Sequence, residues 1–173
     1  MRTRAVFTLA ALLLAVPACD TKKDGTPTIS LSRTGVDKVK ALHRGELSAV
    51  ATYEDVLKKN DTAAWRADFE RMLADHKDAS ERLRTRLVTL GATPDTSAGL
   101  WGGWTDLLAK GAAAIGDAPA RDTLKVGEKH GVSEYEEALR ESTKLDSETA
   151  ALVRDVLLPK AKDHVTTLDS LSK

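Results

Sequence analysis

The stretch GELSAVATYEDVL (residues 45–57) recurs later in the chain as GEKHGVSEYEEAL (residues 127–139), with Gly, Glu, Val, Tyr, Glu and Leu at matching positions. A second match follows each copy, because Asp75-His76 is repeated as Asp163-His164. Internal repeats indicate a structural unit that occurs more than once in the fold. The sequence therefore predicts two related halves that contribute the same polar side chains.

Apolar residues recur every three or four positions around both copies, which is the pattern of amphipathic helices. Short breaks at Asn60-Asp61 and at residues 144–146 join these helices into antiparallel hairpins, and Asp146 or Ser147 is the expected N-cap of the last helix. Pro159 is expected to kink that helix, because proline lacks a backbone N–H and crowds the preceding turn. The predicted helices span residues 34–59, 62–90, 120–143 and 147–171.

A long connection, residues 91–118, separates the two hairpins. A connection of this length in a compact domain usually contains a short helix or has a role of its own. Its Trp101 and Trp104 either close an edge of the bundle or dock a partner in the cell envelope. Two hairpins joined by one long crossover form the ferritin-like type of four-helix bundle, so the predicted fold class is all-α with this topology.

Each predicted helix has one ionisable residue where its apolar stripe calls for a nonpolar side chain. The two residues of each hairpin lie at nearly equal distances from its turn, so at about 1.5 Å per residue they meet at one level. The glycines before the two glutamates each cost about 1 kcal/mol relative to alanine in a helix, so we expect them where space or close backbone approach is needed. The four ionisable residues are Glu46, His76, Glu128 and His164.

Composition excludes several classes of protein. The 26 basic and 26 acidic side chains cancel, so no excess of positive charge is available to bind nucleic acid. The single cysteine excludes an intrachain disulfide, a zinc finger and a CxxC redox site. The chain also lacks a Gly-x-Ser-x-Gly nucleophile elbow and a phosphate-binding glycine loop, so no catalytic nucleophile is predicted.

The N-terminal segment has the features of an export signal. Arg2 and Arg4 precede an apolar run that ends at Val16, which is too short for the roughly 20 residues of a membrane-spanning helix. Val16-Pro17-Ala18-Cys19 resembles the lipobox of bacterial lipoproteins, which implies a lipidated Cys19 that anchors the protein in the envelope, facing the periplasm; the alternative is ordinary secretion. The predicted organisation is a signal peptide (1–18), the lipidated cysteine with a flexible tether (19–33) and the bundle (34–173).

The order Glu, His, Glu, His, with one residue per helix, resembles the ferritin-like superfamily. For a dinuclear metal site, this resemblance implies a Glu on each of two helices and a Glu-x-x-His motif on each of the other two. Here Leu73 and Ala161 stand three residues before the histidines, so the carboxylates that would balance a second ion are missing. A narrower resemblance to a bacterial domain of unknown function, DUF2383, rests on Gly45-Glu46…Tyr53, Gly91…Pro94…Trp101-Gly102…Trp104, Gly127-Glu128…Tyr135 and Asp163-His164…Leu168.

One divalent ion bound by two carboxylates and two neutral imidazoles is electrically neutral, and this donor set suits iron, manganese or zinc. The four buried residues are therefore candidate ligands, with Tyr53 and Tyr135 next to the site and His43 as either a fifth ligand or a rim residue. Two Glu–HisH⁺ pairs without a metal are also neutral, so a metal-free interaction module is the alternative to a metal-binding or stress-related protein. A third hypothesis is a redox enzyme with a mononuclear metal near the tyrosines.

Overall fold

The computed structural model describes residues 33–60, 64–98 and 116–171. All regular secondary structure in these ranges is helical, which confirms the all-α prediction. None of these helices is long and apolar enough to cross a membrane. The predicted signal peptide, Cys19, the tether up to residue 32, Trp101 and Trp104 lie outside the described residues.

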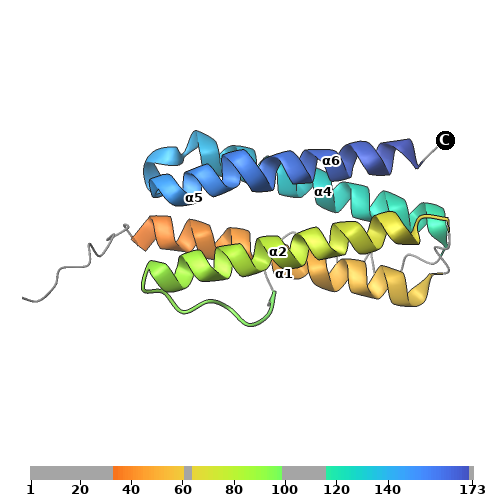
Figure 1. The fold of residues 1–173 in the computed structure, drawn as a ribbon, viewed down its shortest axis with the longest axis horizontal. Coiled ribbons are helices and arrows are strands. Elements are labelled where there is room, and N and C mark those ends of the chain that lie inside the picture. Colours follow the sequence, from red (N-terminus) through yellow and green to blue (C-terminus); the bar gives the residue numbers. More distant parts are fainter. Residues whose placement is uncertain (1–32, 61–63, 99–115, 172–173) are drawn as a thin grey trace, which may run out of the picture.

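Four long helical stretches lie side by side (Figure 1). The first three are α1 (Arg33–Lys59), α2 (Arg66–Thr89) and α4 (Asp117–Arg140), and a short 3-10 helix η1 (Ser142–Lys144) follows α4. The fourth stretch consists of α5 (Ser147–Leu152), the π-helical turn η2 (Val153–Leu157) and α6 (Leu158–Ser170).

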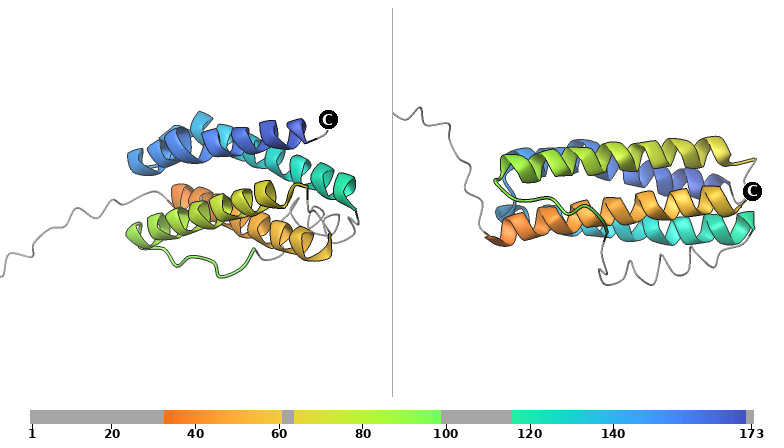
Figure 2. Two further views of the ribbon diagram at one scale, coloured as in Figure 1. Left: turned by 45° about the vertical axis from the view of Figure 1, so that its right-hand side comes forward. Right: turned by 90° about the horizontal axis from the view of Figure 1, so that it is seen from below.

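Helix α1 packs along α2, and α4 packs along α6 (Figure 2). Helix α1 also contacts α4, which brings together the two helices that carry the repeated stretches 45–57 and 127–139. The glutamates of the two repeats therefore approach each other from neighbouring helices.

Helix α2 begins at Arg66, four residues later than predicted. The preceding residue, Trp65, has φ −119° and ψ 1°, outside the helical region. Its ring centroid lies 6.2 Å from that of Phe69, and the guanidinium of Arg121 lies 5.8 Å from the Trp65 ring. The contact with Arg121, which is distant in the sequence, holds the indole at the start of α2, and the apolar spacing alone did not predict it.

The predicted interruption at Pro159 takes the form of the π-helical turn η2. The N–H of Leu158 donates to the carbonyl of Val153, five residues earlier, instead of four as in an α-helix. This wider turn accommodates the proline, which has no N–H to donate and crowds the turn before it. Asp146 is the N-cap of α5, as expected, and its side chain accepts from the N–H of Thr149 at 2.9 Å.

The buried apolar side chains form two clusters along the bundle, with the polar residues of the four helices between them. One cluster contains Val39, Leu42, Ala79, Leu83, Leu87, Tyr135, Ala138, Leu145, Val153, Leu157 and Ala161. The other contains Tyr53, Val56, Phe69, Met72, Ala120, Leu124 and Leu168. Each tyrosine belongs to a different cluster, so the two hydroxyls approach the polar layer from opposite sides.

Candidate metal centre

The structure brings the four ionisable residues together in the bundle core. Glu46 extends from α1, His76 from α2, Glu128 from α4 and His164 from α6, and none is more than 7 % exposed. His76 Nδ1 lies 2.8 Å from Glu46 Oε2, and His164 Nδ1 lies 3.3 Å from Glu128 Oε2. The prediction that the glutamate and histidine of each pair meet at one level is therefore confirmed.

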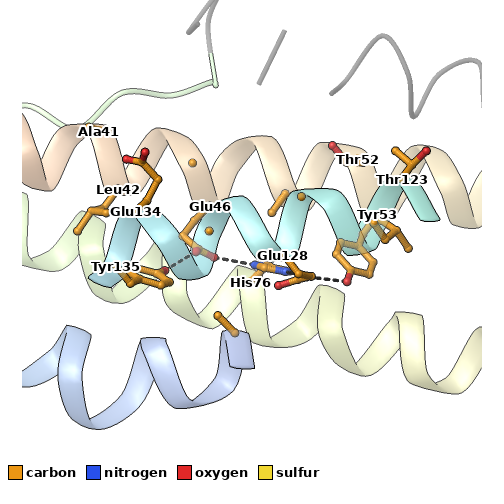
Figure 3. A pocket seen from close by; sticks show the side chains of 16 residues that line it. Ala41, Leu42, Glu46, Thr52, Tyr53, His76, Thr123, Glu128, Glu134 and Tyr135 are labelled. Carbon is orange, nitrogen blue, oxygen red and sulfur yellow. Dashed lines mark hydrogen bonds and ion pairs between the residues drawn. The ribbon is translucent and has the colours of Figure 1, made fainter. Parts of the chain in front are cut away.

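His76 also joins the two helix pairs, because its other ring nitrogen, Nε2, lies 2.8 Å from Glu128 Oε1. The hydroxyl of Tyr135 donates to Glu46 Oε1, and that of Tyr53 donates to Glu128 Oε1 at 2.6 Å. Figure 3 shows these side chains as a continuous row from Tyr135 to Tyr53. Each tyrosine thus bonds to the glutamate of the other repeat, so the sequence duplication produces a crossed pair of contacts.

The electrostatics favour a doubly protonated His76. Burial lowers the pKa of its imidazole, but the charges of Glu46 and Glu128 outweigh burial and raise the pKa to about 10. Burial has the opposite effect on a carboxyl group and raises the pKa of Glu128. His76 and His164 beside it outweigh burial and lower that pKa to about 2. An imidazolium that donates both N–H groups to carboxylates therefore forms the centre of the metal-free network.

Both tyrosine hydroxyls remain protonated in this setting. Burial and the adjacent carboxylates, Glu128 for Tyr53 and Glu46 for Tyr135, raise the pKa of each phenol well above 10. The hydroxyls act as donors that help to neutralise the glutamates, and the rings remain 2 % and 4 % exposed within the apolar clusters. Their position next to the site agrees with the sequence-based expectation.

Asp75 and Lys160 complete the polar layer, although neither was predicted from the sequence as a site residue. Asp75 Oδ2 lies 3.2 Å from His164 Nε2, and Asp75 Oδ1 lies 2.6 Å from Lys160 Nζ. Burial raises the pKa of Asp75, but Lys160 and His164 outweigh it and lower that pKa. The repeated Asp-His dipeptide could have indicated a role for Asp75. The aspartate of the second copy, Asp163, does not share this role, because it contacts Arg71 on the exposed surface.

Three residues form the group that can hold a metal ion: His76, Glu128 and His164 each offer one ligand atom, and these atoms lie within 4.8 Å of one another. Two nitrogen or oxygen ligands on neighbouring positions of one ion lie about 3.0–3.4 Å apart, given bonds of about 2.1 Å. The 3.3 Å between His164 Nδ1 and Glu128 Oε2 falls in that range. Glu46 contacts the opposite nitrogen of His76, so it lies behind the imidazole as seen from Glu128.

His43 takes no part in this group. It is 1 % exposed, so it is not a rim residue, and it is absent from the three-residue cluster. Its Nδ1 has no hydrogen-bond partner within the described part of the chain. Burial lowers the pKa of this imidazole, which favours its neutral form.

A cavity of about 40 Å³ lies against the polar layer, between α1 and α4 (Figure 3). Gly45 and Gly127 both line it, which meets the expectation that these glycines provide space. The repeats contribute to the wall in pairs whose residue numbers differ by 82, and only His76 and Ala161 lie outside this pattern. The pairs are Ala41 and Thr123, Leu42 and Leu124, Gly45 and Gly127, Glu46 and Glu128, Ala49 and Gly131, Thr52 and Glu134, and Tyr53 and Tyr135.

Comparison with protein families gives a match to DUF2383, described as a domain of unknown function, over residues 35–141. The chain belongs to the DUF2383 family. No match is found among curated proteins or among solved structures.

The DUF2383 match covers three of the four ionisable residues and both repeated stretches, and it ends after α4. His164, Lys160 and the rest of α6 lie beyond it. The family description names no chemistry, so any function must be argued from the side chains of the polar layer and the cavity beside it.

Proposed function

We propose that this DUF2383 protein binds a single divalent metal ion through His76 Nε2, Glu128 and His164 Nδ1. The observation that carries the proposal is the placement of carboxylates behind both imidazoles. Glu46 lies 2.8 Å from the far nitrogen of His76, and Asp75 lies 3.2 Å from the far nitrogen of His164. Histidines that ligate metals almost always donate their second N–H to such a partner, which fixes the tautomer and ring orientation.

The charges of the layer suit one divalent ion. With both imidazoles neutral, three carboxylates and the Lys160 ammonium leave two negative charges, which one divalent ion cancels. Two nitrogens and one or two carboxylate oxygens are donors that zinc, iron and manganese accept. A second ion would add two positive charges in a buried layer with no further carboxylate to balance them.

Metal must compete with a proton for the same nitrogen. In the metal-free network, His76 Nε2–H donates to Glu128 at 2.8 Å, so this nitrogen has to lose its proton before it can ligate. The proposal therefore includes release of protons on binding and tighter binding as the pH rises. The pKa of about 10 for His76 makes this competition strong at neutral pH.

A metal-free structural or interaction module is the second candidate, and one observation favours it. Both nitrogens of His76 already have carboxylate partners at 2.8 Å, so the layer is satisfied without an ion. When both imidazoles carry a proton, the layer is also electrically neutral. In this case the network would fix the alignment of the four helices and have no ligand chemistry.

Metal titration of the chelator-treated protein separates the two candidates. We expect one equivalent of Zn²⁺, Mn²⁺ or Fe²⁺ to bind wild type, and Glu128→Gln and His164→Gln to abolish binding. Asp75→Asn is expected to weaken binding about 10–100-fold, because it removes the partner of a ligating histidine. Asp163→Asn is the matched control, since this repeat-equivalent aspartate is 61 % exposed and should leave binding unchanged. If no metal binds and Glu46→Gln alters only stability, the metal-free module is correct.

We further propose that the fold is a ferritin-like bundle of two antiparallel hairpins joined by the long connection between α2 and α4. The colour gradients of α1 and α2, which run in opposite directions in Figure 1, support the first hairpin. A ferritin-like bundle with one buried ion, held at the envelope by a lipidated Cys19, would be a metal-binding or stress-related protein. Cys19→Ser is expected to release the protein from the membrane fraction, and retention there would exclude lipid anchoring.

A further inference from the structure

The cavity between α1 and α4 lies against two of the three proposed metal ligands, His76 and Glu128. Glu46, His76 and Glu128 contribute to its lining, and the remaining wall is mainly small or apolar (Figure 3). The same face of each helix carries the glycine that precedes the glutamate. The space is therefore a consequence of the repeated Gly-Glu pattern in both halves of the chain.

Three protein ligands leave at least one position open on a tetrahedral ion, and in metal sites such a position accepts water or a substrate. This cavity is larger than a second one at the layer, which is about 10 Å³ and adjoins His164 and Lys160. Both volumes are those open to the centre of a water-sized sphere, and by this measure one water molecule requires about 10–15 Å³. About three waters therefore fit in the 40 Å³ cavity. A ligand of two or three non-hydrogen atoms therefore fits in this space.

The charge of the site limits the ligand as well. The metal-loaded layer is neutral, and Glu134 adds a further carboxylate to the cavity wall, so a ligand with several negative charges is disfavoured. The apolar part of the wall also offers no cation to balance such a ligand: among the described lining residues there is no Lys or Arg.

We infer that this cavity admits a ligand of two or three non-hydrogen atoms, neutral or with a single negative charge, to the open position of the metal ion. The inference rests on the proposed metal site. Peroxide and azide have the required size and charge. The repeats thus build a small-molecule access chamber in addition to the ligands themselves.

Gly131 provides a direct way to close the chamber. It lines the cavity on α4, and a Cβ built at this position meets no atom within 4 Å. A side chain can therefore start at this position without a clash at its Cβ, and leucine also raises helix propensity. Ser133→Leu is the matched control, because Ser133 is exposed on the same helix and outside the cavity lining.

The test is an azide titration of the Co²⁺-loaded protein, followed by the visible absorption of the bound ion. We expect saturable spectral changes in wild type and Ser133→Leu, and at least tenfold weaker azide binding in Gly131→Leu with Co²⁺ affinity unchanged. Co²⁺ binding without an azide response overturns the chamber but not the metal site. Equal azide affinity in Gly131→Leu also overturns the chamber. Failure of Co²⁺ to bind wild type overturns both.

Discussion

The imidazolium of His76 makes a sharp prediction about the stability of the metal-free protein. Its pKa is about 10 in the fold, against 6.5 for an unperturbed histidine. Because the folded pKa is the higher one, the contribution of His76 to stability is complete below pH 6.5 and is lost as the pH rises towards 10. At about 1.4 kcal/mol per pH unit, the free energy of unfolding should fall by roughly 3 kcal/mol between pH 7 and pH 9.

The acid side has the opposite sign. The pKa of Glu128 is about 2 in the fold, against 4.5 unperturbed, so its contribution is present above pH 4.5 and is lost as the pH falls towards 2. Maximum stability of the metal-free protein should therefore lie between about pH 4.5 and 6.5. The same His76–Glu128 contact underlies both pKa shifts. Deprotonation of His76 at high pH and protonation of Glu128 at low pH therefore each remove the same stabilising interaction.

Urea unfolding at a series of pH values, with a chelator present, measures this curve. His76→Gln removes the titrating group and should flatten the curve between pH 7 and 9. If that variant does not fold, the imidazole NMR signals of wild-type His76 provide a second reading, and they should not change between pH 5 and 8. A stability that is constant or rises from pH 7 to 9, or a His76 that titrates near 6.5, would refute the doubly protonated bridge.

Three further predictions concern stability. Gly91 has φ +73° at the end of α2, where its N–H donates to the carbonyl of Val88 and the N–H of Ala92 donates to that of Leu87. Gly91→Ala should therefore lower the free energy of unfolding in urea by about 1 kcal/mol. Gly131→Ala, inside α4, should raise it by up to about 1 kcal/mol. Asp146→Ala removes the N-cap of α5 and a partner of the mostly buried Arg86, so thermal unfolding should show a stability lower by about 2 kcal/mol. Asp155→Ala is the control, because Asp155 lies in an exposed ion pair and its loss should leave the melting temperature unchanged. His43→Leu removes a buried nitrogen that lacks a partner among the described residues, so denaturant unfolding should show unchanged or higher stability; a large loss would mean that this nitrogen is satisfied.

The sequence predicted the helices and the level of the polar layer because both follow from the fixed geometry of a helix. A constant rise per residue places Glu46 and His76 at one height once the turn between them is located. The same regularity predicts which face of each helix is buried. The start of α2 was misplaced because Trp65 packs against Arg121, a residue distant along the chain.

The pairing inside the layer could not be predicted from spacing. The duplication suggests equal roles for Asp75 and Asp163, yet only Asp75 meets a histidine of the layer. Which aspartate contacts the imidazole depends on how α2 and α6 are rotated against each other, and a repeat pattern does not define this rotation. Likewise, only the assembled bundle reveals that His76 joins both glutamates.

The most direct test of the metal centre is an anomalous difference map from crystals of the zinc-loaded protein, recorded at the zinc edge. The account predicts one strong peak per chain, within about 2.0–2.2 Å of His76 Nε2, a Glu128 carboxylate oxygen and His164 Nδ1. Glu46 and Asp75 would remain bonded to the far nitrogens of the two imidazoles. A peak elsewhere in the molecule, two peaks in the polar layer, or an empty layer at saturating zinc would contradict it.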